Sequence, residues 1–137
     1  KGGTVNYLLD TDTCIYWLKG NEDIEEKAWK VGLSKISISF VTLSELYYGA
    51  YKSRRVEQNL ANIGILKSKL SLMDSNASIC DVFGKLKAML EKDGEIIDDA
   101  DLFIAACAVD INATLVTNNE KHFKRIKELK VQNWILK

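Results

Sequence analysis

The residue types that build disulfide frameworks and zinc sites are scarce in this sequence. It contains three cysteines, Cys14, Cys80 and Cys107, and a single histidine, His122. The cysteines are odd in number, far apart and in no CxxC pair, which disfavours both a disulfide framework and a zinc site. All three have apolar neighbours, so we expect buried, reduced thiols and a cytoplasmic protein.

Proline is absent, and linker-like segments, internal repeats and low-complexity stretches are missing as well. No apolar run approaches the roughly 20 residues that a membrane-spanning helix needs, and residues 1–3 lack a signal-peptide pattern. With a hydrophobic share of 47% and a charged share of 28%, the composition argues against a disordered chain. We therefore expect a single domain over residues 1–137, without membrane association.

An excess of basic charge is also missing, because 19 Lys and Arg residues balance 19 Asp and Glu residues. Proteins that bind long stretches of nucleic acid usually present a basic surface, so the balance argues against that class. It does not exclude an enzyme that holds only a few nucleotides. Two local basic clusters are better interpreted as solvated helix surface than as RNA contacts; they are Lys52, Arg54 and Arg55, and Lys121, Lys124, Arg125 and Lys127.

Short apolar segments alternate with segments of helical periodicity along the chain. Strands are expected at 5–9, 36–40, 72–73, 114–117 and 131–136. Helices are expected between them, at about 13–19, 24–31, 45–52, 60–70, 77–92, 102–109 and 120–129. This order predicts an α/β protein with a three-layer α/β/α, Rossmann-like fold, in which helices flank a short parallel sheet on both faces.

Acidic and amide side chains follow the predicted strands. Asp10 directly follows the first strand, Glu45 lies about one helical turn after the second, and Asn118 and Asn119 follow the strand at 114–117. Asp101 joins them if its helix starts at the same edge. Ligands of parallel α/β sheets bind beyond the carboxyl ends of the strands, so this edge is the candidate site.

Helix capping is the structural alternative for each acid, because carboxylates near helix N-termini satisfy free N–H groups. Asp12 or Thr13 is expected to cap the first helix, and Asp98 is a candidate cap for the helix that contains Asp101. Residues 42–45 (TLSE) match a capping box, which would give Glu45 a purely structural role.

Capping alone does not account for so many acids together. One side chain suffices at each helix end, whereas residues 10–13 (DTDT) supply four candidates and residues 98–101 (DDAD) supply three acids. Like charges this crowded repel unless they are solvated or neutralised, and a divalent cation is the usual neutraliser. Carboxylate oxygens favour Mg²⁺ or Mn²⁺. No Ser-His-Asp or Cys-His arrangement competes, and His122 is interpreted as a surface or packing residue.

Four segments make the chain resemble the PIN-domain family, and within it the VapC-type toxins of toxin–antitoxin pairs. They are 7–16 (YLLDTDTCIY), 39–50 (SFVTLSELYYGA), 101–106 (DLFIAA) and 115–119 (LVTNN), followed by the Asn133-Trp134 tail. Their order and spacing follow the family over nearly the whole chain. The resemblance implies a Mg²⁺- or Mn²⁺-dependent endoribonuclease that cuts RNA phosphodiester bonds with activated water.

The resemblance also implies which residues form the site. Asp10, Glu45 and Asp101 occupy the family's three principal acidic positions. Asp10 and Asp101 are the expected direct metal ligands, and Glu45 ligates directly or through water. Asn119 stands where family members often carry a fourth acid, which favours one firmly held ion over two. Supporting roles are expected for three neighbours, Thr11, Thr117 and Asp98, of which the last is also the alternative to Asp101.

A toxin of this family would bind an antitoxin protein, and homodimers are common in the family. The candidate contact surfaces are the tyrosines after Glu45 and an apolar face of the next helix, with core packing as the alternative. The residues concerned are Tyr47, Tyr48, Tyr51, Leu60, Ile63 and Leu66.

Two other functions remain open. Residues 10–14 approach the Asp-x-Asp-x-Thr signature of haloacid dehalogenase phosphatases, with Asp10 as nucleophile and Asp12 as general acid, but Cys14 stands at the final position. A PIN module that has lost catalysis and binds proteins is supported by the zero net charge and the neutral Asn119. The three retained carboxylates argue against that alternative.

Overall fold

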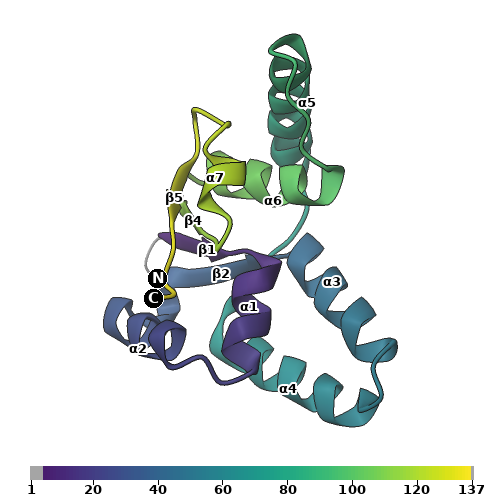
Figure 1. Ribbon diagram of the computed structural model, residues 1–137, viewed down its shortest axis with the longest axis vertical. Coiled ribbons are helices and arrows are strands. Elements are labelled where there is room, and N and C mark those ends of the chain that lie inside the picture. The colour runs from purple at the N-terminus through teal and green to yellow at the C-terminus, as the bar shows by residue number, and fades with distance from the viewer. Residues whose placement is uncertain (1–4, 137) are drawn as a thin grey trace.

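A five-stranded parallel sheet with the strand order β3-β2-β1-β4-β5 forms the centre of the described structure (Figure 1). The computed structural model describes residues 5–136, so residues 1–3, which lack a signal-peptide pattern, lie outside the described residues. The strands are β1 (Tyr7–Leu9), β2 (Ile36–Ser39), β3 (Ser71–Met73), β4 (Thr114–Val116) and β5 (Lys130–Gln132). The helices between them are α1 (Thr11–Leu18), α2 (Glu22–Val31), the short 3-10 helix η1 (Leu33–Lys35), α3 (Phe40–Tyr51), α4 (Val56–Lys69), α5 (Ala77–Lys92), α6 (Asp99–Asp110) and α7 (Glu120–Phe123).

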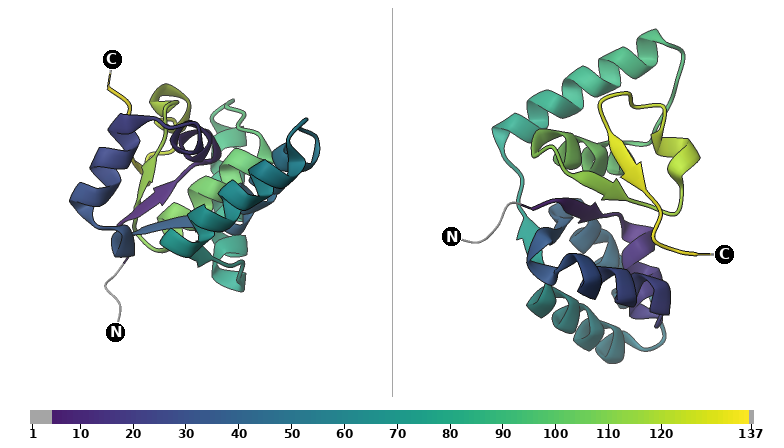
Figure 2. Two further views of the ribbon diagram at one scale, coloured as in Figure 1. Left: turned by 90° about the horizontal axis from the view of Figure 1, so that it is seen from below. Right: turned by 90° about the vertical axis from the view of Figure 1, so that its left-hand side faces the viewer.

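Helices cover both faces of the sheet, which confirms the predicted three-layer α/β/α fold (Figures 1 and 2). Helices α1 to α4 pack on one face, around a core that includes Leu9 and Val116 of the central strands. Helices α5 to α7 pack on the other face, around Leu8 and Leu115. Successive side chains of a strand point to opposite faces, so each pair of neighbouring residues supplies both cores.

Helix α6 is apolar on nearly every side, and the structure buries it as the sequence predicted. Its buried residues include Leu102, Ile104 and the run from Ala105 to Ala108. It packs mainly against α5, with further contacts to α3 and β4. Even so, no helix within residues 5–136 has the length and apolar character needed to cross a membrane.

Two helices begin earlier than the capping patterns predicted, because each strand passes into its helix without a loop. The Asp10 carboxylate accepts a hydrogen bond from the Thr13 N–H at 2.9 Å, so Asp10 caps α1 in place of Asp12 or Thr13. Ser39 caps α3 by accepting the Thr42 N–H at 3.1 Å. The predicted capping box at 42–45 is therefore wrong, and capping does not explain the presence of Glu45.

The C-terminal elements are shorter than predicted. Helix α7 covers only Glu120–Phe123 of the helix expected at 120–129. Beyond it the chain turns through hydrogen bonds that span three residues, from Ile126 N–H to Phe123 O and from Leu129 N–H to Ile126 O. The side chains of Phe123, Ile126 and Leu129 are buried, and apolar residues at a spacing of three resemble the buried face of a helix. Strand β5 also ends early, because the Asn133 side chain accepts a backbone N–H two residues further on.

The burial of the cysteines corrects a further expectation, and the burial of helix α4 selects between two alternatives. Cys14 and Cys107 are buried as predicted, but Cys80 is exposed, because the inward position on its helix belongs to the neighbouring Ile79. Ile63 and Leu66 of α4 are buried in the core, which is the core-packing alternative for these residues.

Two tyrosines of α3 are exposed and remain candidates for the predicted contact surface. Tyr48 and Tyr51 are each 65% exposed, whereas Tyr47 is half-buried. Ile65, on the outer side of α4, is 55% exposed.

Removing the Ser39 cap should destabilise the protein. We expect Ser39→Ala to lower the free energy of unfolding by about 1–2 kcal/mol, because the buried Thr42 N–H loses its acceptor. Ser44→Ala is the matched control, since Ser44 is exposed on the same helix and should change stability by less than about 0.5 kcal/mol. Urea unfolding measures both, and equal losses in the two variants would contradict the assignment of Ser39 as the cap.

Candidate functional site

The carboxyl ends of the central strands meet where the chain reverses its direction across the sheet. From β1 the chain continues to β2 and β3 on one side, and it later returns to β4 and β5 on the other side. A reversal of this kind leaves a crevice at the carboxyl edge, where parallel α/β sheets bind ligands. Leu9 is in register with Ile38 and Val116, so the next residue of each strand, Asp10 among them, reaches this edge.

Asp10 is a buried carboxylate, with 5% of its surface exposed. Burial raises its pKa above the ordinary value, and hydrogen bonds from Thr117 and Thr13 partly oppose that rise. The negative charge of Asp12 raises the pKa further. Within residues 5–136, none of the groups that shift this pKa is a cation. Burial is thus the main cause of the raised pKa, and the hydrogen-bond donors that oppose it, Thr117 and Thr13, are neutral.

Glu45 faces α1 from α3. The Thr11 hydroxyl hydrogen-bonds Glu45 Oε1 and lies 3.1 Å from the Thr42 hydroxyl oxygen. These contacts join the start of α1 to α3 and hold the half-buried Glu45 beside the residue that follows Asp10. The supporting role that the resemblance implies for Thr11 stays a prediction.

Asp101 lies in the first turn of α6 and is the most perturbed carboxylate of the site. Burial, a hydrogen bond with Asp98, and repulsion by Asp98, Glu45 and Asp10 raise the pKa of Asp101 to about 7. Asp98 occupies the cap position of α6 but makes no side-chain capping bond, so its carboxylate is available to Asp101. Carboxylates from the end of β1, from α3 and from α6 therefore influence one another at a single place.

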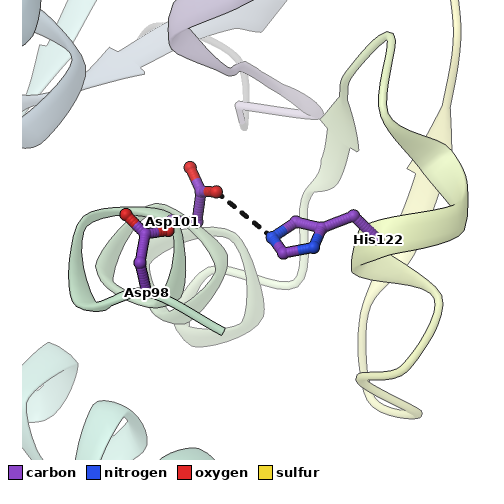
Figure 3. Close-up of side chains that lie close together, drawn as sticks. All are labelled: Asp98, Asp101 and His122. Carbon is purple, nitrogen blue, oxygen red and sulfur yellow. Dashed lines mark hydrogen bonds and ion pairs between the residues drawn. The ribbon is translucent and has the colours of Figure 1, made fainter. Parts of the chain in front are cut away.

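His122 joins this cluster, which the sequence did not predict (Figure 3). Its Nε2 lies 3.2 Å from Asp101 Oδ2, and its Nδ1 lies 2.9 Å from a guanidinium nitrogen of Arg125. Burial and the positive charge of Arg125 lower the pKa of His122. His122 was interpreted from the sequence as a surface or packing residue, and its contact with Asp101 was not predicted. Its place just beyond β4, at the carboxyl edge, was the available signal.

Thr117 and Asn119 complete the edge after β4. Thr117 is fully buried, where its side chain hydrogen-bonds Asp10 and its hydroxyl oxygen accepts the Asn119 N–H at 2.9 Å. Asn119 itself is exposed. Asn118 turns toward the C-terminal segment, where its side-chain oxygen accepts a hydrogen bond from Asn133. Thr117 thus supports Asp10 directly, while Asn119 remains at the solvent side of the site.

The donor set fits a hard divalent cation. Asp10, Glu45, Asp98 and Asp101 present oxygen atoms, which Mg²⁺ and Mn²⁺ prefer. Burial is the largest cause of the raised pKa of Asp101, and a cation would relieve the repulsion by Asp98, Glu45 and Asp10 that adds to it. Among the described residues, the donor atoms that come within 4.8 Å of one another belong to Asp98, Asp101 and His122, and this group does not include Asp10 or Glu45. The catalytic and ligand roles of all these residues remain predictions.

Comparison with known proteins places this arrangement in a family. The PIN domain family matches residues 7–129. Ribonuclease VapC2 of Rickettsia felis is 42% identical over 131 residues, which are 93% of this chain and 97% of the relative. The tRNA(fMet)-specific endonuclease VapC of Shigella flexneri is 33% identical over 130 residues, which are 95% of this chain and 98% of the relative.

Solved structures agree with the sequence relatives. The VapBC2 complex of Rickettsia felis bound to a DNA fragment from its promoter contains a chain with a TM-score of 0.89 and 39% identity, covering 95% of this chain and 99% of that chain. DNA-bound VapBC of Salmonella typhimurium contains one with a TM-score of 0.91 and 34% identity, covering 95% of this chain and 98% of that chain.

The raised pKa of Asp101 predicts a pH-dependent gain in stability from Asp101→Asn in metal-free protein. The folded-state pKa of about 7 exceeds the ordinary value of 3.8, so this group's contribution is full below pH 3.8 and is lost as the pH rises through 7. Asp101→Asn should therefore have the same free energy of unfolding as the parent at about pH 4. At about pH 8 its free energy of unfolding should be higher by on the order of 1 kcal/mol, after allowance for solvent screening.

Urea unfolding in EDTA at the two pH values measures this difference. Asp99→Asn is the matched control, because Asp99 lies in the same helical turn but pairs with Lys87 at the surface. The explanation by repulsion would be contradicted if Asp99→Asn raised the free energy of unfolding at high pH, or if Asp101→Asn did not.

Proposed function

Because the chain belongs to the PIN-domain family, and within it to the VapC ribonucleases, we propose that it is a divalent-metal-dependent endoribonuclease and the toxin of a toxin–antitoxin pair. The relatives are named as a ribonuclease and as a tRNA-specific endonuclease, which makes RNA the substrate class. The reaction is hydrolysis of a phosphodiester bond.

The observation that carries this proposal is the convergence of carboxylates at the carboxyl edge of the sheet. The negative charges of Asp98, Glu45 and Asp10, which come from separate parts of the chain, all raise the pKa of Asp101. Repulsion among these carboxylates opposes folding, so their presence together indicates a bound cation that neutralises them. An RNA phosphate brings further negative charge and cannot bind here without a cation.

Asp10, Asp101 and Glu45 would hold Mg²⁺ or Mn²⁺, with Asp98 beside them. When bound, such a cation makes water more acidic and neutralises charge on the scissile phosphate. Asp10 is the anchor, since Thr13 and Thr117 fix its carboxylate in the interior.

Glu45 and Asn119 have distinct positions in this scheme. Thr11 engages Glu45 Oε1, and Glu45 would interact with the cation through water, with its carboxylate as the acceptor of the proton of the attacking water. Asn119 offers an amide and no negative charge, so the site favours one ion over two. Its exposed side chain is placed to hydrogen-bond water or an RNA phosphate.

Two alternatives differ from this proposal. Membership in the PIN-domain family removes the basis for a haloacid dehalogenase phosphatase, whose signature the chain already missed at Cys14. A PIN module without catalysis would need only the fold. The cleavage experiment separates it from the nuclease, because a silent module retains its structure and cuts no RNA.

An antitoxin protein is the proposed partner, because the similar solved chains belong to VapBC toxin–antitoxin complexes. A groove between α1, α3 and α4 is lined by Ile15, Leu18 and Leu46, with Glu45 at its edge. An apolar antitoxin segment in this groove would lie against Glu45. The exposed Tyr48 and Tyr51 are candidates for contact with a second copy of the chain. The buried cysteine thiols agree with a cytoplasmic location.

Cleavage of a mixed RNA pool by the purified protein tests the function. We expect cutting with Mg²⁺ or Mn²⁺ and none with EDTA. Asp10→Asn, Glu45→Gln and Asp101→Asn should each slow cleavage by at least about 100-fold, because each removes a cation ligand or the proton acceptor.

Asp99→Asn is again the matched control and should cut at the parent rate, since its carboxylate is exposed and bonded to Lys87 at 3.0 Å. If the three site variants cut as fast as the parent, the proposed site is wrong. If folded parent protein cuts no RNA with either metal, the silent module is favoured.

A further inference from the structure

His122 has a hydrogen-bond partner at each ring nitrogen, and the two partners differ in kind. Nδ1 lies 2.9 Å from Arg125 Nη2, and Nε2 lies 3.2 Å from Asp101 Oδ2. A guanidinium can only donate hydrogen bonds, so Nδ1 must accept and must carry no proton. A neutral imidazole then carries its proton on Nε2, where it donates to the Asp101 carboxylate.

Arg125 is itself fixed from three directions. Its Nη1 donates to Glu95 Oε1 at 3.0 Å, its Nε donates to the His122 carbonyl oxygen at 3.0 Å, and its Nη2 faces the ring. The pair with Glu95 ties the segment before α6 to the region after α7. The guanidinium is therefore held in place by contacts that do not depend on the ring.

We propose that Arg125 locks the tautomer of His122 and thereby keeps this histidine a hydrogen-bond donor to Asp101 and not a metal ligand. This inference rests on the proposed metal-dependent function. His122 is then a positioning residue, which holds Asp101 Oδ2 by a hydrogen bond and does not itself bind the cation. Arg125 determines metal selectivity, because the site offers oxygen ligands alone and favours hard cations such as Mg²⁺ and Mn²⁺.

The competing arrangement is a three-ligand site made of Asp98, Asp101 and His122, whose donor atoms lie within 4.8 Å of one another (Figure 3). Two carboxylates and an imidazole would suit Zn²⁺. For Nε2 to ligate, however, its lone pair must be free and the ring proton must move to Nδ1. That proton would face the Arg125 N–H across 2.9 Å, which places two donors against each other.

Nitrogen NMR of the metal-free protein tests the lock directly. His122 is the only histidine of the sequence, so the imidazole signals need no assignment. In EDTA at about pH 8, where the ring is neutral, the parent should carry the proton on Nε2. A proton on Nδ1, or an even mixture of the tautomers, would overturn the proposal without any variant.

Three variants isolate the role of Arg125. Arg125→Met removes the donor and should move the proton at least partly to Nδ1, whereas Arg125→Lys keeps a donor-only cation and should retain the proton on Nε2. Glu95→Gln breaks the ion pair but leaves the guanidinium in place, so it controls for the loss of the bridge. Retention of the parent tautomer in folded Arg125→Met would overturn the lock.

Metal binding provides a second readout that does not depend on catalysis. By calorimetry with Mg²⁺ and Zn²⁺, Arg125→Met should raise the affinity for Zn²⁺ relative to Mg²⁺ by on the order of tenfold, because Nε2 becomes available. Adding His122→Gln to Arg125→Met should abolish that gain, since the amide keeps a donor but offers no imidazole nitrogen.

An unchanged ratio of the two affinities would overturn the selectivity claim even if the tautomer shifts. None of these measurements involves RNA. A parent protein that shows the predicted tautomer and metal selectivity but cuts no RNA would therefore contradict the proposed function and leave the inference intact.

Discussion

Burial of the central strands on both faces is the constraint on which the rest of the structure depends. Leu8 and Leu9 enter opposite cores, as do Leu115 and Val116, so neither β1 nor β4 can shift by one residue without moving apolar side chains to the wrong face. The same packing fixes where each strand ends. This packing brings Asp10 and the residues after β4 to the carboxyl edge, where hydrogen bonds of Asp10 and Thr117 hold them in place.

The site works against the stability that this packing supplies. Asp10 is buried, and burial together with the neighbouring carboxylates raises the pKa of Asp101 to about 7. The two apolar cores provide the stability that tolerates this repulsion. A fold with helices on both faces can therefore concentrate like charges at one edge without losing its structure.

Much of the fold could be predicted from the sequence, because periodic burial leaves a direct trace in the order of residues. The alternation of short apolar strands and helices predicted the three layers, and helix α5 has the predicted bounds. The helix starts were harder, since several adjacent residues could serve as caps and the choice depends on where a strand ends in space. Asp10 and Ser39 became caps because their strands lead straight into helices. The turns after Phe123 repeat every three residues, so their sequence resembles that of a helix.

The part of the site that the sequence did not predict depends on contacts between distant residues. Asp101 and His122 are separated by 21 positions, and Arg125 and Glu95 by 30. A lone histidine has no visible partner until the chain folds, and its protonation pattern depends on a third side chain. A description of this site by its ligands alone would therefore be incomplete. The carboxylates define what can bind, but Arg125 decides whether the imidazole acts as a donor or as a ligand, and this choice distinguishes an oxygen-only site from a mixed one.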